Sequence, residues 1–430
     1  MKYLKFFFLI TLIINSISVY SQSKYFKKNL QTLSSSKMEG RGYVNDGMKK
    51  ASKFLDKEFK RNGLKSFNNT YFQKVTFPIN IIQDAKLNLN GKSLIYGKDF
   101  IVKPNTKHTS FSNNQIYNFP VEEFLSSGNS NIDFKRFIEN EIDVQLNKNI
   151  VLPHLNSNID SINKVYKNWG SKFKDKNFKD VVIFRFTNDS LTSSLSQTQS
   201  NVSEFIIKSK YYSKDLKIED YAIKTKFDSD FEFNNVIGYL DGENNDSVIV
   251  ITAHYDHLGR VGNAIFPGAS DNASGTAMAL DLMKHYAKNK PKYKTVFMFF
   301  GAEEAGIVGA YKYVENPLFP LNQIKFLVNL DLMANGGEGI QVVNGTKYSK
   351  EFNQIVQINK ETKLLKDIKI RGESCNSDHC PFDKKGVPSF FIYTLGGNSH
   401  YHNVYDTYRN LDLKYSDNVK ELIIKFIDQL

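Results

Sequence analysis

Cysteine is scarce in this sequence, which excludes two classes of small scaffold. Only two of the 430 residues are cysteines, Cys375 and Cys380. Two thiols cannot build a zinc-finger framework or a disulfide-rich scaffold. They flank the segment 377–379, so a local disulfide and two free thiols both stay open at this point.

Long apolar runs are missing beyond the first segment. Lys2 and Lys5 precede the apolar stretch Phe6–Ile14, and small and polar residues follow up to Ser21. This pattern is typical of a secretory signal peptide over residues 1–21, and no later stretch could stop transfer. We expect an exported protein, periplasmic or secreted, with no stable membrane insertion after cleavage. An uncleaved N-terminal anchor is the alternative.

A basic stripe is also missing, although the net charge is +12 and the pI is about 9.2. The lysines are scattered among Asn, Ile, Ser and Tyr, without interleaved aromatics or a nucleic-acid module. The excess charge is therefore a general compositional bias, and we expect no nucleic-acid partner.

The chain is long enough for two domains, and its pattern of apolar and polar residues changes twice along the sequence. An amphipathic helix with Ala51, Leu55 and Phe59 on one face ends near Gly63. Short alternating apolar segments between Asn, Ser, Gly and Lys clusters then follow. We predict a β-rich insertion over 80–231, between a first part of the main domain (22–79) and its remainder (232–430).

Strands and helices alternate from Asn234 onward, which predicts an α/β fold with a mixed, largely parallel central sheet between helices. The expected strands are Val248–Ala253, Thr295–Phe300, Phe326–Leu330 and Ser389–Tyr393, and the expected helices are 273–286, 304–314, 349–360 and 416–430. In such sheets ligands collect at the carboxyl ends of the strands.

Histidines and carboxylates gather at those strand ends. The residues in question are His254, Asp256, Asp271, Glu303, Glu304, Asp331, His400 and His402. Imidazole and carboxylate together form a nitrogen and oxygen ligand set that suits zinc. Two ions would need a bridging carboxylate, for which Asp271 is a candidate, and a separate carboxylate to take the proton of the attacking water. Asp256, two residues after His254, can orient that imidazole.

Simpler roles remain open for several of these residues. Asp271 could cap the following helix, and Glu303–Glu304 could form a first helical turn. His400 competes with His402 for one ligand position. His257 is a polar neighbour rather than a ligand in our interpretation.

The motifs resemble, in chain order, those of the M28 family of zinc aminopeptidases. The segments are 254–257 (HYDH), 268–275 (GASDNASG), 300–306 (FGAEEAG), 329–331 (NLD), 377–379 (SDH) and 402–407 (HNVYDT), with 39–41 (EGR) and 71–73 (YFQ) before them. The resemblance covers about residues 30–78 and 232–430. It implies a zinc-exopeptidase-like fold, and the insertion is loosely similar to the protease-associated domain of some members.

The resemblance also implies roles for individual residues. It makes His254 and Asp331 ligands of one zinc, Glu304 and His402 ligands of a second, and Asp271 the bridge. Glu303 is the implied general base. Asp256 supports His254. His379 is not assigned by the resemblance; in our interpretation it lies beside the site or on its substrate side, and a structural loop residue is the equally favoured alternative.

The expected function is hydrolysis of the N-terminal peptide bond of peptides with a free N-terminus, with two zinc ions per chain. A glutaminyl cyclase, or a dipeptidase or carboxypeptidase-like enzyme on the same scaffold, is the alternative. A binding protein that has lost its metal is a third reading, but every ligand position is filled here. The preferred N-terminal residue is not encoded in these motifs.

Overall fold

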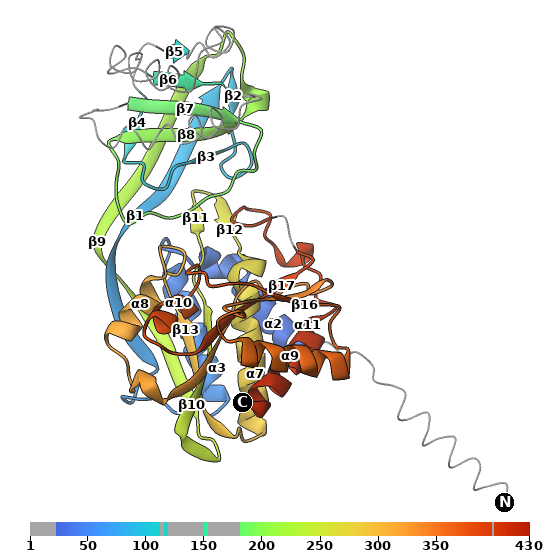
Figure 1. Ribbon diagram of the computed structural model, residues 1–430. Coiled ribbons are helices and arrows are strands. Elements are labelled where there is room, and N and C mark those ends of the chain that lie inside the picture. The colour runs from blue at the N-terminus through green and yellow to red at the C-terminus, as the bar shows by residue number, and fades with distance from the viewer. Residues whose placement is uncertain (1–22, 112–115, 119–148, 154–180, 398–399) are drawn as a thin grey trace, which may run out of the picture.

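The computed structural model describes residues 23–111, 116–118, 149–153, 181–397 and 400–430. The predicted signal peptide lies outside these residues. The described chain forms a sheet of ten strands, with helices packed around it, and a sheet of five strands (Figure 1). None of the helices described combines the length and the apolar character needed to cross a membrane.

The ten-stranded sheet, called the main sheet below, is mixed, and its central strands are parallel. Strands β13, β10, β14 and β17 pair in parallel, while β9 adds to β13 and β15 adds to β17 in antiparallel fashion. This confirms the predicted α/β fold with a largely parallel central sheet. The strands are β1 (Phe72–Leu89), β2 (Lys92–Ser93), β4 (Thr109–Ser110), β9 (Ile218–Leu240), β10 (Asn244–His254), β13 (Tyr293–Phe300), β14 (Ile324–Leu330), β15 (Gly339–Val343), β16 (Ile368–Ile370) and β17 (Ser389–Leu395).

Helices cover both faces of the main sheet because its central strands are apolar on both sides. Along β10, Ile249 and Ile251 pack into the larger core, whereas Val248 and Val250 pack into a second core on the opposite face. The larger core contains α2 (Lys24–Leu33), α3 (Gly47–Arg61), α7 (Gly275–Lys288), α9 (Ser349–Thr362) and α11 (Ser416–Gln429), and the second core contains α8 (Val308–Glu315) and α10 (His379–Lys384).

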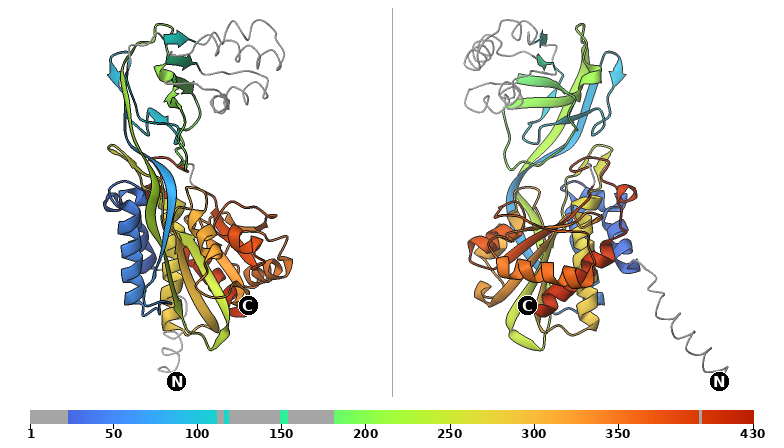
Figure 2. Two further views of the ribbon diagram at one scale, coloured as in Figure 1. Left: turned by 90° about the vertical axis from the view of Figure 1, so that its left-hand side faces the viewer. Right: turned by 45° about the vertical axis from the view of Figure 1, so that its right-hand side comes forward.

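Two long strands connect the main sheet to the five-stranded sheet. β1 and β9 pair in antiparallel fashion from Phe72–Val236 to Leu89–Ile218, with three register shifts along the way, and Figure 2 shows this ribbon running from one sheet to the other. The predicted boundaries at 79/80 and 231/232 fall within these strands. The five-stranded sheet consists of β3 (Phe100–Val102), β5 (Ile116–Asn118), β6 (Asn149–Leu152), β7 (Val181–Thr187) and β8 (Val202–Lys208), and it packs on its own apolar core.

Candidate metal centre

Three neighbouring parallel strands end at the same edge of the main sheet and bring the predicted residues together. His254 is the last residue of the central strand β10, which lies between β14 and β13. Asp331 follows β14 directly, and Glu303 and Glu304 follow β13 after two residues. The sheet topology therefore places an imidazole between carboxylates from both sides.

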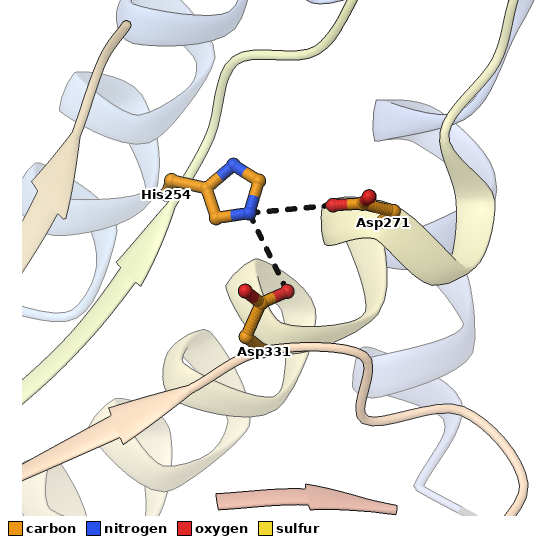
Figure 3. A group of neighbouring side chains, drawn as sticks. All are labelled: His254, Asp271 and Asp331. Carbon is orange, nitrogen blue, oxygen red and sulfur yellow. Dashed lines mark ion pairs between the residues drawn. The ribbon is translucent and has the colours of Figure 1, made fainter. Parts of the chain in front are cut away.

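His254, Asp271 and Asp331 form the first group of the cluster. His254 Nε2 lies 3.3 Å from Asp271 Oδ1 and 3.4 Å from Asp331 Oδ1. Figure 3 shows the imidazole edge turned toward both carboxylates, which come from different segments of the chain. These three side chains are buried and close enough to share one metal ion.

His402 and Glu304 form a second group on the other side of Asp271. His402 Nε2 lies 3.0 Å from Asp271 Oδ2 and 2.9 Å from Glu304 Oε2. The two oxygens of Asp271 thus face different histidines. His257 completes the group, since its Nδ1 lies 2.6 Å from Glu304 Oε1.

Asp271 does not cap a helix. Helix α7 begins four residues later, at Gly275, and Asp271 itself has non-helical φ and ψ angles. Its backbone is held from two sides: the Asp406 carboxylate accepts a hydrogen bond from Asp271 N at 3.0 Å, and Arg41 Nη2 donates to Asp271 O at 3.2 Å. The carboxylate of Asp271 is left to face the two histidines.

Glu303 and Glu304 lie in a turn before α8 rather than in its first helical turn. The predicted helix over 304–314 begins in the structure at Val308. The physical reason is that Glu303 N and Glu304 N donate to the Asp256 carboxylate, at 3.1 and 3.4 Å, instead of pointing along a helix axis. The same Asp256 contacts His254, whose Nδ1 lies 3.3 Å from the Asp256 carbonyl oxygen.

The electrostatics of the cluster favour positive charge between its carboxylates. Burial acts to lower the pKa of His402, but Glu304 and Asp271 raise it to about 11. Burial and Asp271 act to raise the pKa of Glu304, yet His402 and His257 bring it to about 2. For Glu303, burial raises the pKa, with Asp378, Glu304 and Asp331 adding to the effect against His254.

The residues present fit divalent metal ions. The donors are imidazole nitrogens and carboxylate oxygens, the set that zinc takes in catalytic sites. Asp331 Oδ1, which faces His254, is buried and has no hydrogen-bond partner among the described residues. Buried charges of one sign are costly unless they are paired or coordinate a metal, so the carboxylate excess points to cations.

Within the Ser377-Asp378-His379 motif, Ser377 contacts the cluster, whereas the contacts of His379 lie elsewhere. Ser377 Oγ donates to Asp331 Oδ2 at 3.2 Å and accepts from Asn329 Nδ2 at 2.8 Å, which orients Asp331. His379 instead packs its ring against Phe391, with Nε2 2.8 Å from the Ser374 carbonyl oxygen. The flanking cysteines, Cys375 and Cys380, form a disulfide.

For several residues at the site, the sequence had predicted no role. Arg41 donates to five backbone carbonyls around the Asp271 loop, and Tyr401 stacks on the His402 ring with centroids 3.7 Å apart. Ser193, which lies 209 positions earlier in the sequence, in the predicted insertion, contacts His402. Arg41 and Asp406 stand in the recognised motifs, but no local pattern marks Ser193.

Comparison with known proteins identifies the family of the C-terminal part of the chain, which carries the central strands of the main sheet. The model of peptidase family M28 matches residues 235–427, which include the whole cluster described above except Arg41 and Ser193. This part of the chain belongs to peptidase family M28. Aminopeptidase YwaD of Bacillus subtilis is 28% identical to this chain over 177 residues, which are 40% of the chain and 38% of the relative. The chain thus matches well under half of that relative's length.

Solved structures share the fold of this chain over most of its length. A zinc aminopeptidase from Bacillus subtilis superposes with a TM-score of 0.65 at 16% identity, covering 94% of both chains. An M28 peptidase precursor from Shewanella amazonensis gives a TM-score of 0.67 at 15% identity, covering 94% of this chain and 92% of that one. At such low identity these likenesses concern the fold alone.

Proposed function

We propose that this M28 protein is a zinc-dependent aminopeptidase, which removes the N-terminal residue from peptides with a free amino group. The observation that carries the proposal is the position of Asp271, whose two carboxylate oxygens face His254 and His402 respectively. A carboxylate between two such groups suits a pair of metal ions. The names of the similar aminopeptidases support the same activity.

In this proposal His254 and Asp331 would hold one zinc, Glu304 and His402 would hold the other, and Asp271 would serve both. Zinc bound in this way acts as a Lewis acid on a carbonyl oxygen and lowers the pKa of water. Asp256 and Ser377 orient these side chains through hydrogen bonds to His254 and Asp331.

Glu303 is the proposed general base. Its carboxylate lies at the cluster, with Oε2 4.0 Å from His254 Nε2, and its backbone is fixed by Asp256. It accepts a proton from the attacking water and returns it to the nitrogen of the leaving amine. The free α-amino group of the substrate would bind near the metal centre, which would direct hydrolysis to the N-terminal peptide bond.

We also propose that the protein works outside the cytoplasm and that residues 80–231 form an inserted domain. The leader pattern of residues 1–21 supports export. The disulfide between Cys375 and Cys380 agrees with an oxidising compartment.

The test compares wild type, Glu303→Gln and a matched control, Glu315→Gln, in a panel of aminoacyl-nitroanilides. Glu315 is an exposed glutamate at the end of α8, paired only weakly with Lys312. We expect about two zinc ions in every protein, full activity in the control, and a loss of about 10²- to 10⁴-fold in kcat for Glu303→Gln. Zinc content is measured on the same samples.

Other outcomes separate the alternatives. Cyclisation of N-terminal glutamine peptides without hydrolysis of the panel would make the protein a glutaminyl cyclase. Zinc binding with neither activity would favour a dipeptidase or carboxypeptidase-like reaction and reject the aminopeptidase. Full activity of Glu303→Gln would remove Glu303 from the role of base.

A further inference from the structure

A segment of the predicted insertion lies against the metal centre. Residues 191–199, called the strap below, lie within the connection from β7 to β8 of the five-stranded sheet. Leu195 packs against the cores of both sheets, so the strap spans the junction between them. Asn80 N donates to Ser196 O at 2.8 Å, and Gln199 Nε2 donates to Asn80 Oδ1 at 2.8 Å, which tie the strap to β1.

The strap makes a paired contact with His402 through Ser193. The Ser193 carbonyl oxygen lies 3.1 Å from His402 Nδ1, and Ser193 N donates to His402 O at 2.9 Å. The backbone of His402 has φ +56°, a left-handed conformation that a residue with a Cβ adopts reluctantly. The two hydrogen bonds therefore fix both the imidazole and the backbone that carries it.

The strap also reaches the turn that carries the two glutamates. Gln197 Nε2 donates to the carbonyl oxygen of Ala305, directly after Glu304, at 2.7 Å. Both proposed ligands of the second zinc, His402 and Glu304, thus stand beside a strap contact. For His402 the carbonyl of Ser193 also selects the tautomer, because a proton on Nδ1 leaves Nε2 free to bind metal.

His254 is supported differently. Its Nδ1 faces the carbonyl oxygen of Asp256, two residues away in the same loop, and its neighbour Asp331 is held by Ser377. These supports all come from the main sheet and its loops. The two halves of the metal centre therefore depend on different parts of the chain.

We propose that the strap sets the zinc affinity of the Glu304–His402 half of the centre, and that Ser193 is a positioning residue for His402. The proposal rests on the dinuclear zinc centre of the proposed function. A movement of the five-stranded sheet that displaces the strap would release His402 and weaken one zinc without disturbing the other.

The experiment measures zinc affinity directly, by titrating metal-free protein with zinc in competition with a chromophoric chelator. Ser193→Pro removes the N–H that bonds to His402 O, whereas the matched control Ser193→Ala keeps the backbone pair. Gln197→Ala is a second, milder variant, and His402→Ala shows the effect of losing the second zinc entirely. Hydrolysis is not needed as a readout.

We expect two zinc ions for wild type and Ser193→Ala. Ser193→Pro should keep one zinc at wild-type affinity and bind the other about 10- to 100-fold more weakly, as is typical when a residue that supports a metal ligand is lost. Gln197→Ala should shift in the same direction by less. The zinc that remains tightly bound shows that the variant is folded.

The proposal fails if Ser193→Pro and Gln197→Ala both bind two zinc ions with wild-type affinities. It fails equally if both zinc ions are weakened together, because that would indicate a general loss of structure. A wild-type protein that binds at most one zinc would overturn the dinuclear centre itself, a result distinct from any effect of the strap.

Discussion

Replacing Arg41 by methionine should destabilise the fold more than any charge change on the surface. Arg41 is fully buried, and its guanidinium donates to the carbonyl oxygens of Tyr255 (2.8 Å), Leu33 (2.9 Å), Pro267 (2.7 Å), Gly268 (2.7 Å) and Asp271 (3.2 Å). Burial lowers the pKa of Arg41 to about 10, against the attraction of carboxylates such as Asp271, so the side chain stays charged at neutral pH.

The magnitude follows from what the substitution leaves behind. Methionine fills much of the volume but donates nothing, so buried carbonyls lose their partner at about 1–3 kcal/mol for each one left unsatisfied. The backbone can relax and the losses do not add, so we take the range for breaking a buried charged network, about 3–5 kcal/mol. The free energy of unfolding of Arg41→Lys should fall between those of wild type and Arg41→Met, because one ammonium group cannot reach all five oxygens.

The assay is urea denaturation followed by circular dichroism, in chelator, so that bound zinc does not contribute to the free energy of unfolding. Arg409→Met is the control: Arg409 is exposed and lies in the short 3-10 helix Tyr408–Asn410, away from the Asp271 loop's carbonyl network. It should cost less than about 1 kcal/mol. If Arg41→Met costs as little as this control, the carbonyl network does not hold the Asp271 loop and the reasoning is wrong.

Two further substitutions test the surroundings of the site. Asp406→Ala should lower the free energy of unfolding by about 2–4 kcal/mol in the same assay, because the buried carboxylate accepts hydrogen bonds from Ser270 N (2.9 Å) and Asp271 N (3.0 Å). Asp406→Asn keeps one acceptor oxygen and should lower it by less. Equal effects of the two substitutions would contradict this reasoning. Burial lowers the pKa of His379 to about 4, although the carbonyl of Ser374 acts to raise it. A neutral folded-state imidazole stabilises the protein fully above its unfolded pKa of about 6.5 and loses that contribution as pH falls toward 4, by about 3 kcal/mol in all. Wild type should therefore lose more stability than His379→Gln between pH 7 and 5, and parallel pH curves for the two proteins would refute the assignment.

Much of the fold could be predicted because its signals are local. The run Val248–Ala253 is apolar at every position but one, Thr252, as a strand buried on both faces requires, and it forms most of β10. The alternation of strands and helices then implies parallel strands with their carboxyl ends at one edge. The start of α8 was misplaced, because the hydrogen bonds from Glu303 and Glu304 to Asp256 cross 47 and 48 positions of sequence and leave no local pattern.

The sequence by itself determined which side chains are available for chemistry: His254, Asp271, Glu303, Glu304, Asp331 and His402 stand in motifs that resemble, in chain order, those of peptidase family M28. It also determined that these residues reach one edge of a sheet, because strand direction follows from the order of elements. Only the tertiary structure decided how these side chains are held. The Ser193 carbonyl, 209 positions from His402, is a backbone group that any residue could supply. Since backbone groups carry no residue-specific signal, contacts of this kind emerge only once the chain has folded.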